Sequence, residues 1–309
     1  MERGYWSVNR WGSYSNDENP PVGYERYMYG MILSFSRLKS KQTILTTDNS
    51  SSVTVSEEYT YYDPKNTHIQ KVTRATSNAS EKRIEEYKYP QNYTDAIYTA
   101  MVAKNMTAPV VEQISYGGTD GTLETKRVKT NYTNTSTITN GLILPASIQT
   151  SASGTNGLLT EVNFNKYDSR GNLLQATLKD GSSISYLWSY NYQYPIAEIK
   201  NATLSEVNAV LSPVFGVASA DALSALATPN ETKLKDGSLQ KALPGALITT
   251  YTYKPLIGML TATDPSGIIT YYAYDSFGRL KEAYTYKDNI VSAANKQIVQ
   301  SYDYHYQNQ

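Results

Sequence analysis

Cysteine is absent from the 309-residue chain, histidine occurs only twice and phenylalanine only four times. The absence of cysteine excludes disulfides, thiol catalysis and cysteine-ligated metal. His68 and His305 lie far apart in the sequence, so a Ser-His-Asp triad or a histidine metal site is hard to build. We therefore predict no catalytic residue, no metal and no cofactor.

An excess of charge and long apolar runs are also missing. The 28 Lys and Arg residues balance 28 Asp and Glu residues, and no basic cluster is present, so we expect no nucleic-acid partner. No apolar run approaches the roughly 20 residues that a membrane helix requires, and we expect no membrane insertion. The opening letters MERGYWSVNRWGSY lack a hydrophobic signal region, so we expect the chain to be part of a longer protein.

Tyrosine is the abundant aromatic residue, with 29 copies against 4 phenylalanines. Tyrosines often stand two residues apart beside Thr and Val, as in Tyr251 with Tyr253 and Tyr272 with Tyr274. Aromatic and β-branched residues at a period of two are typical of half-buried antiparallel strands. The composition therefore predicts a mainly β fold.

Two stretches of the chain repeat one pattern. GLLTEVNFNKYDSRGNLLQATLKDG covers 157–181, and GIITYYAYDSFGRLKEAYTYKDN covers 267–289. Each contains an alternating strand, the letters Tyr-Asp-x-x-Gly, and a second alternating strand, and a weaker copy covers 245–267. The length of one copy suits one β-hairpin. We predict an extended antiparallel sheet of successive hairpins.

The Tyr-Asp-x-x-Gly letters predict the reversal of each hairpin. The aspartate can accept main-chain N–H bonds across a turn, and the glycine can adopt the positive φ that closes it. A type I turn followed by a left-handed glycine bulge is the expected geometry. The residues assigned to these turns are Tyr167, Asp168, Gly171, Tyr274, Asp275 and Gly278.

The chain shows no sharp composition break, and we expect one continuous β-strip with two helical insertions. Residues 1–150 would form Tyr-rich hairpins with one helix near 94–105. Residues 151–309 would form the repeat hairpins with a helical insertion near 203–228. The Ser/Gly/Asn-rich segment at 150–157 is the weakest place between these regions.

Helix start signals support both insertions. Thr94 is a candidate N-cap of the first helix. Thr203 and Glu206 form the sequence of a capping box at the start of the second. The simplest role for the inserted helices is to cover part of the sheet.

One segment, SISYLWSYNYQYP (183–195), alternates aromatic with small or polar residues. We expect Ile184 to Tyr194 to form a single long strand with its rings on one face. Exposed rings could stack on sugars, and Tyr186, Trp188 and Tyr190 are the candidate glycan-stacking residues. The alternative, which we favour, is that the inserted helices cover these rings.

The repeats resemble the YD-repeat, or RHS-repeat, family. The resemblance rests on YDSRGNL (167–173), YDSFGRL (274–280), the ATDPSG before the second copy, and YLWSYNYQYPIAEIKNAT, which is similar to long RHS proteins of Bacteroidetes-like bacteria. It is clear over 156–309 and looser before. The resemblance implies hairpins joined edge to edge in a sheet that curls toward a hollow shell. In the family such a shell encloses a variable, often toxic, C-terminal polypeptide.

The resemblance also implies partners and a location. The partners would be further repeats and the C-terminal cargo of the same polypeptide, in a secreted or surface-exposed protein that serves toxin delivery, bacterial competition or cell–cell contact. The predicted function is therefore a non-enzymatic scaffold or encapsulating segment. A carbohydrate-binding surface module is the alternative from another class.

A third hypothesis for the function is self-cleavage. Some family members cut themselves at a DPxG-type motif, and Asp264-Pro265-Ser266-Gly267 has these letters. Here the motif leads directly into another repeat, so a proline-containing turn is the favoured interpretation. A self-cleaving aspartyl protease that uses Asp264 stays as the third hypothesis.

Overall fold

The computed structural model describes residues 37–46, 52–63, 66–76, 81–152 and 157–304. His305 lies outside the described residues. The chain divides into two compact units, Met1–Ala75 and Thr76–Gln309. In both units the described strands pair antiparallel.

The described residues of the first unit form three strands: β1 (Ser40–Thr46), β2 (Ser52–Asp63) and β3 (Asn66–Ala75). They pair antiparallel in chain order, with β2 in the middle. An ion pair of 2.7 Å joins Arg74 Nε on β3 to Glu57 Oε1 on β2. The Tyr59 hydroxyl donates to the other oxygen of the same carboxylate at 2.6 Å.

In the second unit the described residues form thirteen strands, which also pair antiparallel in chain order. They are β4 (Lys82–Lys88), β5 (Glu112–Gly117), β6 (Leu123–Thr133), β7 (Leu144–Ala152), β8 (Leu159–Tyr167), β9 (Leu173–Leu178), β10 (Ser183–Ser189), β11 (Tyr194–Lys200), β12 (Leu247–Lys254), β13 (Gly258–Thr263), β14 (Ile269–Tyr274), β15 (Leu280–Tyr286) and β16 (Lys296–Ser301). The prediction of a mainly β fold of successive antiparallel hairpins is confirmed.

Chain-order pairing follows from the short connections, because two antiparallel neighbours need only a turn between them. No described strand joins β16 to β4, so the sheet of the second unit is open. Strands β7 and β8, which flank the Ser/Gly/Asn-rich segment near 150–157, pair directly with each other.

The helices of the second unit lie in the connections between strands. They are α1 (Ala96–Ala103), α2 (Ser136–Thr139), α3 (Leu204–Phe215), α4 (Ala220–Ser224), α5 (Glu231–Lys235) and α6 (Ser238–Ala242), with the short 3₁₀ turns Pro90–Asn92, Lys287–Asn289 and Ala293–Asn295. The second insertion therefore extends past the predicted end near 228 to Ala242. Helices α5 and α6 have five residues each, too few to show a helical period in the sequence.

The predicted helix starts have different outcomes. Helix α1 begins after Asp95 as its N-cap, not after Thr94, and the Asp95 side chain makes no capping bond. The capping box of α3 is confirmed: the Glu206 N–H donates to Thr203 Oγ1 at 3.3 Å, and the Thr203 N–H donates to the Glu206 carboxylate at 2.8 Å.

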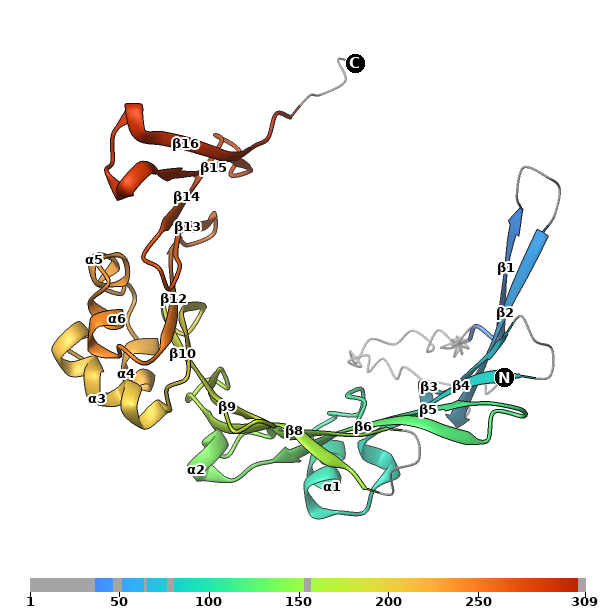
Figure 1. Cartoon of the computed structure of the whole chain (residues 1–309). Coiled ribbons are helices and arrows are strands. Elements are labelled where there is room, and N and C mark those ends of the chain that lie inside the picture. Colours follow the sequence, from blue (N-terminus) through green and yellow to red (C-terminus); the bar gives the residue numbers. More distant parts are fainter. Residues whose placement is uncertain (1–36, 47–51, 64–65, 77–80, 153–156, 305–309) are drawn as a thin grey trace, which may run out of the picture. The chain divides into compact units, whose positions relative to one another are not determined.

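The largest core lies where α3–α6 pack on strands β10–β12 (Figure 1). Leu187 and Ile199 of the sheet and Leu211 of α3 are fully buried there. Each such side chain contributes roughly 1.5–3 kcal/mol through its removal from water. A smaller core holds Met101 of α1 against Val111. The inserted helices thus supply the apolar cover that an open sheet lacks.

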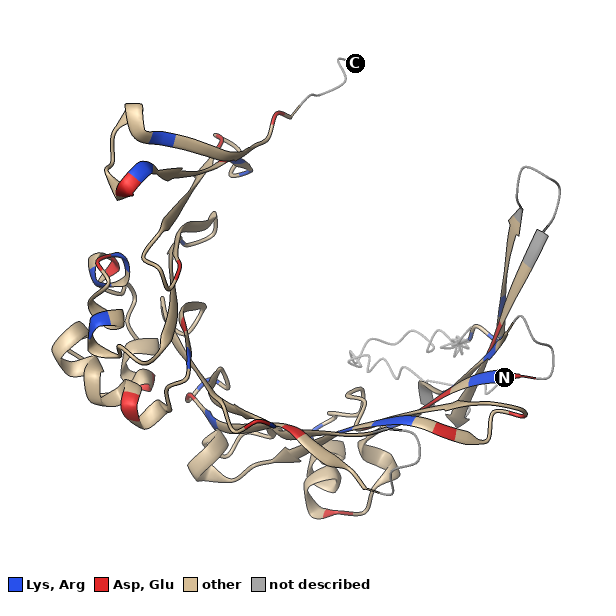
Figure 2. Cartoon of the chain, viewed as in Figure 1, with Lys and Arg blue, Asp and Glu red and all other residues tan. Residues whose placement is uncertain are grey.

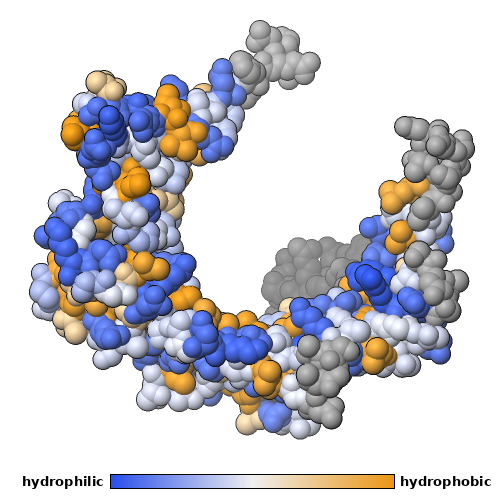
Figure 3. Space-filling view, viewed as in Figure 1, coloured by the Kyte–Doolittle hydropathy of each residue, from blue (hydrophilic) through white to orange (hydrophobic). Residues whose placement is uncertain are grey.

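Charges of both signs are interspersed along the described elements (Figure 2), as the balanced composition requires. On the face seen in Figure 3, apolar and polar atoms alternate in small patches. Among the described residues, none of the helices has the length and apolar character needed to span a bilayer.

Candidate functional site

The Tyr-Asp-x-x-Gly motifs lie at two equivalent turns. Asp168 Oδ1 accepts the main-chain N–H groups of Arg170 and Asn172, both at 2.9 Å, and Gly171 has a φ of +91°. Asp275 and Gly278 repeat this arrangement, with N–H bonds at 2.9 Å from the same relative positions and a φ of +76°. Only glycine adopts such a φ without strain, so each motif specifies its own turn.

The Asp264-Pro265-Ser266-Gly267 segment forms a third turn of this kind. Asp264 Oδ1 accepts the N–H groups of Ser266 and Ile268 at 2.9 Å, and Gly267 has a φ of +83°. The carboxylate is exposed to solvent. This turn joins β13 to β14, while the Asp275 turn joins β14 to β15, so the two turns lie at opposite edges of the strip.

The tyrosine before each turn aspartate bonds to the preceding hairpin. The Tyr167 hydroxyl, at the end of β8, donates to the main-chain oxygen of Pro145 at the start of β7, at 2.8 Å. The Tyr274 hydroxyl, at the end of β14, donates to the main-chain oxygen of Met259 at the start of β13, also at 2.8 Å. We call these contacts inter-hairpin bonds. In each, an aromatic N–H or O–H group donates to a main-chain oxygen on the second strand of the preceding hairpin.

Two further inter-hairpin bonds complete the series. The Trp188 indole Nε1–H, near the end of β10, donates to the main-chain oxygen of Leu173 on β9 at 2.9 Å. The Tyr304 hydroxyl, just after β16, donates to the main-chain oxygen of Leu280 on β15 at 2.9 Å. Trp188 therefore makes the bond on β10 that Tyr167 makes on β8 and Tyr274 makes on β14.

The acceptor carbonyls share one local geometry. On each acceptor strand, the residue directly after the acceptor has no partner in the pairing with the first strand of its hairpin. This extra residue forms a β-bulge. The extra residues are Ala146, Leu174, Leu260 and Lys281. A bulge disrupts the ladder locally, and the aromatic donor of the next hairpin bonds to the carbonyl beside it.

The predicted single strand from Ile184 to Tyr194 is wrong. Strand β10 ends at Ser189, and the chain turns through Tyr190, Asn191 and Tyr192, which all have positive φ. The helical insertion holds this turn: the Asn191 N–H donates to the Leu226 oxygen at 2.8 Å, and the Tyr192 N–H donates to the Ser224 oxygen at 2.7 Å. These tertiary bonds compensate for the unfavourable backbone conformation.

The three candidate glycan-stacking residues lie in different environments. Tyr190 is only 3% exposed, and its hydroxyl donates to Glu231 Oε1 of α5 at 2.8 Å. Burial raises its pKa well above the ordinary value of 10. Trp188 is half-buried against the main core. The structure therefore does not bring the three rings together as one exposed ladder.

Tyr186 points to the opposite face of the sheet from the helices. Leu187, its neighbour, is under the helices, and side chains alternate along a strand. The pairing of β10–β15 places Tyr251 and Tyr272 on the same face as Tyr186. All three rings are half-buried, and Lys200 and Glu198, which form a 3.1 Å ion pair, belong to this face. We call these three residues the tyrosine row.

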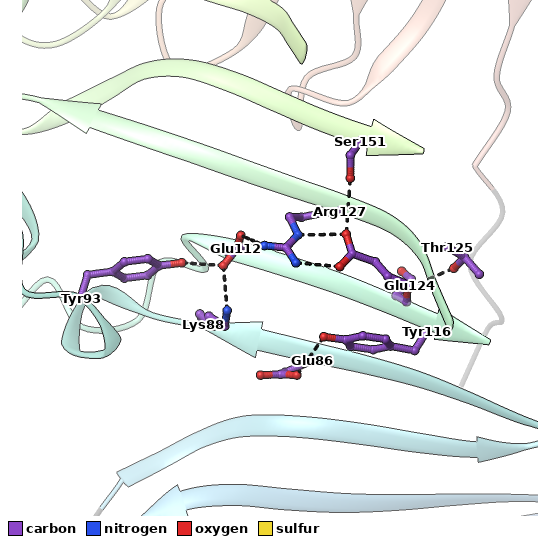
Figure 4. A network of polar contacts seen from close by, with 10 residues as sticks. Glu86, Lys88, Tyr93, Glu112, Tyr116, Glu124, Thr125, Arg127 and Ser151 are labelled. Atoms are coloured by element: carbon purple, nitrogen blue, oxygen red, sulfur yellow. Dashed lines mark hydrogen bonds and ion pairs between the residues drawn. The ribbon is translucent and has the colours of Figure 1, made fainter. Parts of the chain in front are cut away.

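A polar network that sequence reasoning missed joins β4, β5 and β6 (Figure 4). Glu112, only 5% exposed, accepts the Tyr93 hydroxyl at 2.9 Å and ion-pairs with Lys88 at 3.1 Å and Arg127 at 3.0 Å. Arg127 also reaches Glu124 at 2.6 Å. Burial opposes ionisation of Glu112, but its hydrogen bonds and the charges of Lys88 and Arg127 outweigh that effect and lower its pKa below the ordinary 4.5.

The contacts of this network link β4, β5 and β6 to one another. Each carboxylate oxygen of Glu112 has at least one donor in the network: Oε2 contacts Tyr93 and Lys88, and Oε1 contacts Arg127. The residues come from three strands and from Tyr93, which follows the 3₁₀ turn Pro90–Asn92, and the sequence spacing contains no signal that would bring them together. The fold and its contacts define the class of the second unit as an open strip of hairpins joined by recurrent aromatic–carbonyl bonds.

Comparisons with known proteins give a weak similarity in structure alone. No protein-family model matches the chain, and no curated protein matches it. The Tc holotoxin pore of Photorhabdus luminescens is 12% identical with a TM-score of 0.36, over 81% of this chain and 12% of that chain. TcdB2-TccC3 without its hypervariable C-terminal region is 13% identical with a TM-score of 0.37, over 85% of this chain and 11% of that one. This similarity assigns neither a family nor an activity to the chain.

Proposed function

We propose that this chain is a non-enzymatic wall segment of a larger secreted or surface-exposed YD-repeat protein, which encloses or carries another part of the same polypeptide. The observation that supports this role is the series of four inter-hairpin bonds. A wall made of hairpins must resist separation between one hairpin and the next. At four of its junctions, a hydrogen bond from one hairpin to its predecessor adds to the main-chain ladder.

The same contacts give a reason for Tyr or Trp, instead of Phe, at these four positions. A phenylalanine ring would pack against the neighbouring strand equally well but would leave the bulge carbonyl without its donor. Tyr and Trp combine an apolar ring with an N–H or O–H group. Trp188, one of the three candidate glycan-stacking residues, thus holds two hairpins together.

Protection of enclosed polypeptide tests the wall function. A recognition site for a specific protease is inserted outside residues 1–309 in the complete gene product, where the cargo would lie. We expect slow cleavage of the intact protein and fast cleavage after Trp188→Ala with Tyr274→Ala, because both changes remove inter-hairpin bonds. Equal cleavage rates at a site in the intact protein and in an unfolded control would refute enclosure.

Carbohydrate binding is the second candidate, and the tyrosine row favours it. Tyr186, Tyr251 and Tyr272 are half-buried rings on a face that the inserted helices do not cover. Binding of the purified chain to an immobilised glycan panel tests this function. Loss of binding in Tyr251→Ala, with retention in Tyr192→Ala, would assign the glycan to the row.

The mass of the purified chain, measured after long incubation, tests self-cleavage through Asp264. The Asp264 carboxylate is bonded to two turn amides, and we propose that it only shapes the turn. The purified chain should keep its full mass during long incubation over a range of pH values. Fragments that disappear in Asp264→Asn would overturn the non-enzymatic proposal.

A further inference from the structure

The two most exposed large apolar side chains of the described residues belong to turns at one edge of the strip. Leu256, between β12 and β13, is 95% exposed, and Phe277, between β14 and β15, is 78% exposed. Alternate turns of successive antiparallel strands fall on the same side. A Cβ added at Gly278 would lie 3.5 Å from Ile257 Cδ1, so the two turns are neighbours. We call Leu256, Ile257 and Phe277 the turn patch.

Neither Leu256 nor Phe277 is required by the turn that carries it. Leu256 has a φ of +67°, which is unfavourable for a bulky side chain and which glycine or asparagine adopts more readily. Phe277 has the third position of an Asp-x-x-Gly turn, where the two other turns of this kind have Arg170 and Ser266. The aspartate accepts the same two N–H groups in all three turns. Turn formation thus gives no reason for a large apolar side chain at either tip.

Basic groups flank the turn patch. Lys254, at the end of β12, and Lys281, on β15, are both exposed. Arg279 lies in the turn itself, and its guanidinium pairs with Asp275 at 2.6 Å. The one carboxylate of these two turns is therefore neutralised, and the two lysines leave the surroundings of the patch with positive charge.

The opposite edge of the same strands offers an internal comparison. The connection from β15 to β16 also exposes apolar side chains, Ile290 at 58% and Val291 at 67%. The exposed charges in that connection and in the β13–β14 turn are Asp264, Lys287 and Asp288, which sum to a negative charge. Among these four connections, exposed apolar side chains and an excess of positive charge occur together only at the turn patch.

We propose that the turn patch docks on the surface of a lipid bilayer with anionic headgroups. Leu256 and Phe277 project singly from turn tips, and such side chains enter a fluid lipid interface without a preformed pocket, whereas a folded protein partner would need a hollow for each. Lys254 and Lys281 would approach lipid phosphates, because basic groups beside apolar ones strengthen binding to anionic lipid. This contact lies at the bilayer surface and needs no membrane-spanning segment.

Docking on a bilayer is separate from the wall function, because no residue of the turn patch donates an inter-hairpin bond. The first test is sedimentation of the whole chain with vesicles of equal parts phosphatidylcholine and phosphatidylglycerol. We expect half-maximal binding near roughly 1 mM accessible lipid, about tenfold weaker than binding through one myristoyl chain. Pure phosphatidylcholine vesicles should bind at least fivefold more weakly. Absence of binding, or equal binding to the two kinds of vesicle, would overturn the proposal.

Variants separate the apolar contribution from the charges. Leu256→Asn with Phe277→Ser should weaken binding to the anionic vesicles at least tenfold. Lys254→Gln with Lys281→Gln should weaken it about fivefold and leave the weak binding to phosphatidylcholine unchanged.

The matched control is Ile290→Asn with Val291→Ser at the opposite edge, which should bind as the parent chain does. Thermal unfolding checks that each variant is folded. If the Leu256 and Phe277 double variant fails to fold, Phe277→Ser alone decides, because serine has the same position in the Asp264 turn. Unchanged binding in the folded patch variant, or an equal loss in the control, would refute docking through the turn patch.

The absence of cysteine allows one fluorophore to be placed at one chosen residue. Leu256→Cys and Phe277→Cys, each labelled with a polarity-sensitive dye, should emit at shorter wavelength when anionic vesicles are added, whereas labelled Val291→Cys should not. The same shift without vesicles, as the protein concentration rises, would show that a second copy covers the patch. That result, or no shift at either patch position, would overturn the membrane assignment.

Discussion

The indole Nε1 of Trp188 donates to the main-chain oxygen of Leu173 at 2.9 Å, across the junction between two hairpins. The Tyr167 and Tyr274 hydroxyls make the equivalent bonds in other hairpins at 2.8 Å. A different side chain thus performs the same task at the same place, which indicates that the donor matters more than the ring that carries it.

Trp188→Phe should destabilise the chain by about 1–3 kcal/mol, because a partly buried carbonyl loses its donor. The matched control is Tyr186→Phe, two residues earlier on β10, whose hydroxyl has no hydrogen bond to a described residue; its effect should stay within about 0.5 kcal/mol. Urea denaturation followed by circular dichroism measures both. A loss for Trp188→Phe no larger than that for Tyr186→Phe would refute a stabilising bond from Trp188 to Leu173.

Tyr274→Phe should cost about 0.5–1.5 kcal/mol through the loss of its bond to Met259. Tyr272→Phe, on the same strand and the same face, is the control. Because Tyr274 and Trp188 share no partner, the losses of Tyr274→Phe and Trp188→Phe should add in the double variant. A double variant no less stable than Trp188→Phe would contradict independent inter-hairpin bonds.

Gly278→Val should destabilise by roughly 1–3 kcal/mol, because valine resists the φ of +76° at this position. An added Cβ would meet only Ile257 Cδ1 at 3.5 Å, an ordinary contact, so the loss reports backbone strain. Gly245→Ala is the control, since Gly245 is in open space without a positive φ. A Gly278→Val chain as stable as the parent would show that the turn has another conformation in solution.

Thr263→Val should be neutral or stabilising by about 1 kcal/mol, because its hydroxyl is buried without a described partner. Thr252→Val should instead destabilise by about 1–2 kcal/mol, because it leaves the Thr261 hydroxyl unpaired. Thermal unfolding of the two variants under identical conditions gives the comparison. A larger loss for Thr263→Val than for Thr252→Val would disprove the assignment of an unpaired hydroxyl.

Acid should weaken the network around Glu112. The pKa of Glu112 is lowered in the folded chain, so its contribution is fully present above the unfolded carboxyl pKa of about 4.3 and is lost as pH falls through the lower folded value. Glu112→Gln should lower the free energy of unfolding at pH 7 by about 1–3 kcal/mol and flatten its decline below pH 5. If the free energy of unfolding of Glu112→Gln falls below pH 5 as steeply as that of the parent chain, other carboxylates cause the decline.

The turns and the capping box could be predicted because the interacting groups are close in sequence. Asp168 and Asp275 bond to N–H groups two and four residues later, and Thr203 bonds to a residue three positions later. Such contacts form whatever the rest of the chain does. The five-residue helices α5 and α6 gave no periodic signal, and so the end of the second insertion was missed.

The sequence by itself determined the strands, the Asp-x-x-Gly turns and the mainly β class, because these depend on period-two patterns and on local hydrogen bonds. Only the tertiary structure decided that the segment after Ser189 turns, since Leu226 and Ser224 of the insertion bind its N–H groups. It also decided that Trp188 joins two hairpins and that Tyr186 lies on the uncovered face. Each of these depends on residues that are distant in the chain, whose contacts no local pattern encodes.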